Sequence, residues 1–122
     1  MKKSTVAAVA VPSGDAGLFL LFTSGANGGF VSEIDYQAIG SGTCGTSIMN
    51  IWKTDTGGVN AQIIKSITVA AGTGAISTTN AGVFGSNIFS LLNLATGEKI
   101  YVSFTVLAAN VTYNVVAFGG QF

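Results

Sequence analysis

Residues 30–38 have the sequence FVSEIDYQA and alternate between two kinds of side chain. One face of this stretch is apolar apart from a serine, and it carries Phe30, Ser32, Ile34, Tyr36 and Ala38. The other face is polar and carries Glu33, Asp35 and Gln37. Because successive side chains of a strand point to opposite sides, this period of two predicts a half-buried β-strand.

Strand signals recur along the whole chain, whereas good helix formers are scarce. The predicted strands are residues 5–11, 17–23, 30–38, 46–53, 62–70, 87–94, 98–107 and 110–118. Residues 17–23 are apolar throughout, as expected for a strand that is covered on both faces. Clusters of glycine, asparagine, serine and proline separate the strands. About eight short strands predict an all-β fold: a two-sheet antiparallel sandwich of the jelly-roll or TNF-like type.

The length of 122 residues fits a single β-sandwich domain over residues 1–122. Residues 1–11 begin with Met1, Lys2 and Lys3 and contain the apolar run Val6–Val11, and we expect them to form an N-terminal arm or the first strand. Cys44 is the only cysteine, which excludes an intrachain disulfide and a cysteine metal cluster.

The composition excludes several classes of function. Charged residues make up 8% of the chain, with five lysines, no arginine and five carboxylates. Five scattered lysines cannot neutralise a phosphate backbone, so we expect no nucleic-acid partner. The longest apolar runs, Val6–Val11 and Leu18–Phe22, are too short for a membrane helix. Such low charge on a polar surface predicts that much of the outside is buried against other subunits or a partner.

Catalytic chemistry has little support in the sequence. The chain lacks histidine, the commonest general base, so the Cys44 thiol in its glycine-rich turn has no histidine to activate it. Glu33 and Asp35 could form a carboxylate pair for glycoside hydrolysis, but a solvated strand face explains them more simply. Asp15, Asp55 and Glu98 do not have the spacing of a calcium loop. We therefore expect a protein that is not an enzyme and has no cofactor or metal.

Large apolar side chains are the candidates for a contact surface, because aromatic anchors dominate protein interfaces. The candidate interface residues are Trp52, Tyr101, Tyr113, Phe118, Phe122, Val6, Val9 and Val11. Tyr101 lies on the polar side of its predicted strand, so it is a better candidate for an exposed contact than Trp52. The same exposed tyrosine, tryptophan and asparagine side chains could instead bind a sugar.

The C-terminal third, Thr96–Phe122, resembles small structural proteins of tailed bacteriophage virions. The specific part is the ending NVVAFGGQF at residues 114–122, an asparagine-flanked strand that closes on an aromatic residue and Gly-Gly. The preceding turn and strand TGEKIYVSF at residues 96–104 and the strand LFLLFTSG at residues 18–25 are similar to the same group. These motifs carry no catalytic residues.

The resemblance implies a jelly-roll sandwich, commonly a homotrimer, that is mounted on the phage particle. It favours a head decoration (cement) protein on the capsid surface, with the major capsid protein as its partner. Such a protein binds over subunit junctions and holds the shell against the pressure of the packaged DNA. The alternatives are a tail or fibre component, or a carbohydrate- or receptor-binding module on the same fold.

Overall fold

Ten strands and no helix make up the part of the chain that the computed structural model describes, which is residues 4–11, 18–40, 42–73, 84–106 and 111–122. Within these ranges the side chains of residues 4–11, 44, 73 and 84–91 are not described. The strands are β1 (Ser4–Val11), β2 (Phe19–Thr23), β3 (Gly29–Ile39), β4 (Thr43–Cys44), β5 (Ser47–Thr54), β6 (Gln62–Val69), β7 (Gly72–Thr73), β8 (Phe84–Leu94), β9 (Lys99–Phe104) and β10 (Thr112–Gln121). The eight long strands match the eight predicted ones.

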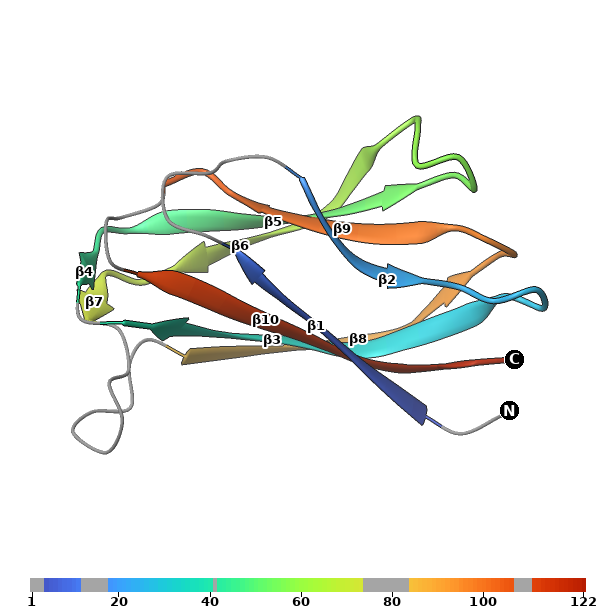
Figure 1. Ribbon diagram of the computed structural model, residues 1–122, viewed down its shortest axis with the longest axis horizontal. Coiled ribbons are helices and arrows are strands. Elements are labelled where there is room, and N and C mark those ends of the chain that lie inside the picture. Colours follow the sequence, from blue (N-terminus) through green and yellow to red (C-terminus); the bar gives the residue numbers. More distant parts are fainter. Residues whose placement is uncertain (1–3, 12–17, 41, 74–83, 107–110) are drawn as a thin grey trace.

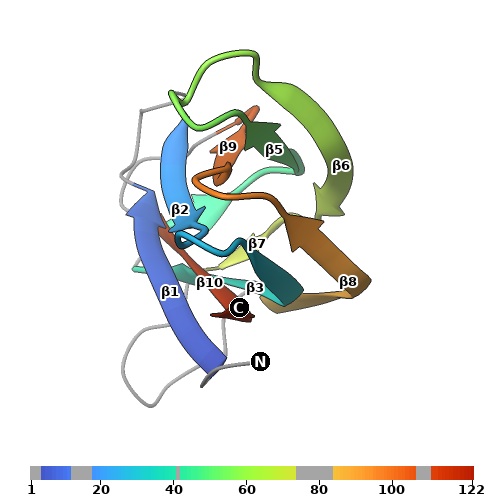
Figure 2. The same ribbon diagram turned by 90° about the vertical axis from the view of Figure 1, so that its right-hand side faces the viewer.

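The long strands form two four-stranded antiparallel sheets that pack face to face (Figures 1 and 2). Sheet A has the order β1-β10-β3-β8, and sheet B has the order β2-β9-β5-β6. Among the long strands the first pairs with the last, the second with the next to last, and so on inward to β5 and β6. This is the path of a long hairpin rolled into two layers, and it confirms the predicted jelly-roll sandwich. The short strands β4 and β7 pair separately.

The core lies between the sheets and is built from alternate residues of the strands, as the period of two predicts. Sheet A contributes Ile34 and Val115, and sheet B contributes Ile51 and Ile100, all with no exposed surface. Aromatic rings stack across the same interior.

A bulge in β3 changes the predicted alternation. Ser32 has no partner of its own in the ladder, because Glu33 pairs with Phe118 and Val31 pairs with Gly119. The extra residue shifts the phase of the strand, so the buried residue is Val31 and not Ser32, contrary to our prediction. The Ser32 hydroxyl instead donates a hydrogen bond to the Phe118 carbonyl oxygen at 3.1 Å.

Gly119 allows this bulge to form. A Cβ atom on Gly119 would lie 2.1 Å from the carbonyl oxygen of Phe30 and 3.1 Å from the Cα of Val31. No side chain fits at that distance, so the close approach of β3 and β10 requires glycine here. The first glycine of the C-terminal Gly-Gly therefore has a structural reason.

Candidate functional site

The outer face of sheet B carries a row of large side chains that crosses all four strands. Leu20 on β2 pairs with Tyr101 on β9, Tyr101 pairs with Trp52 on β5, and Trp52 pairs with Ile63 on β6. Residues paired directly across neighbouring strands share a face, so these four residues form one continuous line, the sheet B row. Its two ends, Leu20 and Ile63, are 47% and 50% exposed.

One hydrogen bond and one close contact hold the aromatic middle of the sheet B row in place. The indole Nε1 of Trp52 donates to the hydroxyl of Ser103 at 2.8 Å, and the Tyr101 hydroxyl lies against Gly58. Next to the row runs a neutral polar line of paired residues, in which Ser66 donates to the Asn50 side chain at 2.6 Å. An aromatic centre beside uncharged polar groups is the composition of a protein interface.

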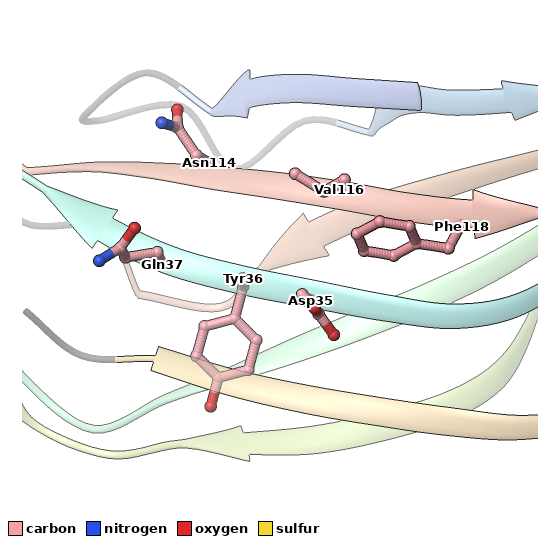
Figure 3. Close-up of a pocket in the computed structure, with 6 residues that line it drawn as sticks. All are labelled: Asp35, Tyr36, Gln37, Asn114, Val116 and Phe118. Carbon is pink, nitrogen blue, oxygen red and sulfur yellow. The ribbon is translucent and has the colours of Figure 1, made fainter. Parts of the chain in front are cut away.

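The outer face of sheet A is different, because a shallow hollow of about 240 Å³ lies over β3 and β10. It is lined by Asp35, Tyr36, Gln37, Asn114, Val116 and Phe118, which together form the sheet A hollow (Figure 3). Asn114 pairs directly with Gln37, and Val116 pairs with Asp35. The carboxylate of Asp35 therefore lies beside the apolar Val116, and the side-chain amides of Gln37 and Asn114 lie beside each other.

Tyr36 lies between Asp35 and Gln37 in the chain, and its side chain is buried in the sandwich. Burial raises the pKa of the Tyr36 hydroxyl, so this group stays protonated at neutral pH. Strand β3 thus has polar side chains on its outer face and an uncharged tyrosine on its inner face.

A second hollow, of about 210 Å³, lies at the end of sheet B beside the turn of residues 55–60. Asp55 is engaged within this turn, because its Oδ1 accepts from the backbone of Gly57 at 3.1 Å and of Val59 at 3.0 Å. Its Oδ2 accepts from the Asn60 amide at 2.7 Å. These contacts give Asp55 the role of a turn-forming residue.

Glu98 and Lys53 form an ion pair of 3.0 Å at the edge of the same hollow. Partial burial acts to raise the pKa of Glu98, but the backbone N–H of Ala95 and the Lys53 ammonium outweigh it. The pKa of Glu98 is therefore lowered, and the carboxylate is ionised at neutral pH.

The other predicted interface residues fall in three places. Phe118 lies on the outer face of sheet A at 37% exposure. Phe122 is 42% exposed and stacks on Phe30 with 5.8 Å between ring centres. Tyr113 has no exposed surface and stacks on Phe104 at 4.3 Å, so in the single chain it is a core residue that joins the two sheets.

The N-terminal segment Ser4–Val11 forms a complete strand, β1, in the single chain. Val6, Val9 and Val11 pair with Phe118, Val115 and Tyr113 of β10, and their side chains lie outside the described residues. Of the two roles that we predict for residues 1–11, the first strand is therefore the one that residues 4–11 adopt here.

The two carboxylates considered for glycoside hydrolysis lie two residues apart on one strand, whereas Asp15 and the Cys44 side chain lie outside the described residues. Glu33 and Asp35 lie on the outward side of β3, and Asp35 alone lines the hollow. No group of three potential metal ligands occurs among the described residues. The described part of the chain also contains no helix with the length and apolar character needed to cross a membrane.

Sequence reasoning missed both ends of the sheet B row. We expected residues 17–23 to be covered on both faces, and this is wrong for the single chain, because Leu18 and Leu20 are exposed. A run of apolar residues is expected for a strand covered on both faces, but it is also expected for a strand whose outward face is apolar and exposed. Considering this second possibility would have identified Leu20. Ile63 could not be identified because it is followed directly by another isoleucine, Ile64, so the sequence does not show which of the two points outward.

Comparison with solved structures finds a chain with the same fold. It belongs to a structure described as the acidic stable capsid structure of Helicobacter pylori bacteriophage KHP30. The TM-score is 0.65 at 10% sequence identity, and the match covers 98% of this chain and 88% of that chain. This likeness of fold agrees with the resemblance to phage virion proteins. No known family profile and no curated protein sequence matches this chain.

Proposed function

We propose that this protein is a non-enzymatic structural component of a phage virion, a decoration (cement) protein that attaches to the surface of the head shell. The observation that carries the proposal is the whole-chain match of fold to a chain in a phage capsid structure. Fold alone does not fix function, so the proposal also depends on the chemistry of the surface.

The surface supports an adhesive role. The exposed Leu20 and Ile63 flank the half-buried Trp52 and Tyr101 in the sheet B row. The adjacent line of Asn50, Ser66 and Ser103 is uncharged. Interfaces are depleted of charge at their centre and enriched in tyrosine and tryptophan. We infer that the sheet B row faces the major capsid protein, with Trp52 and Tyr101 as its central anchors.

A homotrimer is the assembly that we propose for attachment. Three copies of a weak contact bind far more tightly than one, because the second and third contacts form at a high effective concentration. Light scattering on a size-exclusion peak tests this, with a trimer expected at three times the 12.3 kDa of one chain. A monomer at every concentration would contradict the trimer.

The test of shell attachment uses head shells from a mutant of the encoding phage that lacks this protein. Purified protein is added, the shells are sedimented, and the bound copies are counted. We expect saturable binding and a higher temperature of DNA release. Binding to tails, or no binding to shells, would overturn the decoration role.

Matched variants locate the contact. Tyr101→Ala removes an anchor of the sheet B row, and we expect it to weaken shell binding at least about tenfold. Phe118→Ala removes an aromatic side chain from the opposite face, and we expect it to bind shells like the unmodified protein. Equal effects of the two variants would contradict the assignment of the sheet B row to the shell.

A further inference from the structure

The sheet A hollow has a chemistry that adhesion to a protein shell does not need. Figure 3 shows Asn114, Val116 and Phe118 along β10 and Asp35 and Gln37 along β3. The two side-chain amides lie toward one end, and the phenyl ring lies toward the other. One small hollow thus combines apolar surface, amide donors and acceptors, and a carboxylate.

The hollow is built on a rigid part of the fold. Its residues come from β3 and β10, which are the two central strands of sheet A and are flanked by β8 and β1. Side chains on central strands hold their relative positions better than side chains on loops. The direct pairing of Asn114 with Gln37 sets the two amides side by side across the strands.

The size of the hollow selects a small ligand. Its volume of about 240 Å³ is below the range of roughly 300–1,000 Å³ that is usual for drug-sized molecules. Alternate residues of a strand are about 7 Å apart, so a ring seated over Val116 reaches the amides on one side and Phe118 on the other. A single six-membered ring with polar substituents fits these limits.

The polar groups select the kind of ring. Side-chain amides both donate and accept hydrogen bonds, and a carboxylate oxygen accepts them, which suits the hydroxyl groups of a ring. Val116 and the 37% exposed Phe118 offer apolar surface to the C–H face of such a ring. Asp35 is the charged group among the lining residues, so an acidic ligand would be repelled.

We propose that the sheet A hollow binds one neutral sugar ring, either as a free sugar or as a unit of a surface polysaccharide. The C–H face of the sugar packs on Val116 and Phe118. Its hydroxyl groups bond to the amides of Gln37 and Asn114 and to the Asp35 carboxylate. This site lies on the opposite sheet from the sheet B row and is independent of shell attachment.

The first experiment is a titration of the labelled protein followed by NMR. Glucose, galactose, mannose and glucuronic acid are the probes. We expect one or more neutral sugars to shift the side-chain amide signals of Gln37 and Asn114, and glucuronic acid to leave them unchanged. No shift with any neutral sugar, shifts that map to Trp52 and Tyr101, or equal binding of glucuronic acid would overturn the proposal.

The second experiment uses a matched pair of surface phenylalanines. Phe118→Ala should lower the affinity for the responding sugar about tenfold. Phe122→Ala removes a side chain of similar exposure, 42%, outside the hollow, and should leave the affinity unchanged. Because both residues are partly exposed, thermal unfolding checks that each variant folds, and Gln37→Leu gives a second test within the hollow. Unchanged sugar affinity in both Phe118→Ala and Gln37→Leu would overturn the assignment.

A glycan array separates the two sources of the sugar. Binding to polysaccharide chains that is lost in Phe118→Ala supports recognition of a surface glycan. Binding of monosaccharide alone supports a site for free sugar. Array binding that persists in Phe118→Ala would place sugar recognition elsewhere and overturn the proposal. Shell binding by Phe118→Ala reports separately on the proposed virion function.

Discussion

The outer faces of the two sheets differ in chemistry although the sheets share one core. The face of sheet B is crossed by the apolar sheet B row, and the line of residues beside it is neutral. The face of sheet A holds a hollow with a carboxylate and two amides. Alternation explains how both can exist, because the inward residues of a strand satisfy the core and leave the outward residues free to specialise. A sandwich can therefore carry two unrelated surfaces.

The largest expected effect is on the stability of the fold, and it comes from breaking the pairing of β3 with β10. These strands belong to sheet A, so the change acts directly on the face of sheet A and not on that of sheet B. Gly119→Ala places a Cβ 2.1 Å from a backbone oxygen, which cannot move without opening sheet A. We expect a loss of about 3 kcal/mol in the free energy of unfolding, or failure to fold. Urea denaturation measures the loss.

The control for this variant is Gly45→Ala, since a Cβ on Gly45 meets no atom within 4 Å. Its free energy of unfolding should change by less than about 0.5 kcal/mol. Equal stabilities of the two variants would show that the bulge does not depend on glycine at position 119.

The next effect concerns the centre of the sheet B row. Trp52→Ala removes the indole and leaves the buried Ser103 hydroxyl without its 2.8 Å donor. We expect shell affinity to fall at least about thirtyfold, as at an interface hot spot. Trp52→Phe keeps an aromatic ring and should lose less, as measured by sedimentation with shells. Full binding by Trp52→Ala would move the shell contact to another face.

A smaller effect is expected on self-association through the edge of sheet B, which is distinct from binding through its face. β6 is one of the two edge strands of sheet B, and Lys65 on it pairs with the buried Ile51, so the lysine lies on the inward side of that edge. Inward charges on edge strands oppose pairing with other chains. Lys65→Ile should therefore lower the concentration at which the protein self-associates, by about tenfold. Light scattering measures this, and Lys65→Arg is the control that keeps the charge.

The smallest effect is the pH dependence from Glu98 at the end of sheet B. Its pKa is lowered in the folded protein, so the ion pair with Lys53 stabilises the fold above the unfolded pKa of Glu98. That stability is lost as the pH falls through the folded pKa. We expect Glu98→Gln to cost about 0.5 kcal/mol at pH 7 and nothing at pH 2, measured by thermal unfolding. An equal cost at both pH values would exclude an ionic cause.

Most of the fold could be predicted because alternation reports directly on strands and on their buried faces. Ile34, Tyr36 and Ala38 are buried as predicted, and the alternate residues Ile100, Val102 and Phe104 of β9 are buried in the same way. The exception at Ser32 arises from a bulge, which depends on the partner strand and leaves no periodic signal. The short strands β4 and β7 were missed for a related reason, since two residues carry no period.

The candidate surfaces could be predicted only in part. Trp52 and Tyr101 were identified by residue type, but their position side by side depends on strand register. Tyr113 has the same residue type as Tyr101 and lies in the core, because the two differ in which side of the strand they occupy. The sheet A hollow joins residues about eighty positions apart in the chain, so no local pattern could indicate it.

The rolled-hairpin order of strands has a consequence for how the protein is made. β10 lies between β1 and β3 in sheet A, and β9 lies between β2 and β5 in sheet B. Sheet B cannot close until β9 has left the ribosome, and sheet A cannot close until β10 has, so β1 and β2 must wait for their partner strands. A chain of this topology needs protection during synthesis, and low temperature or a chaperone should raise its soluble yield more than any surface substitution.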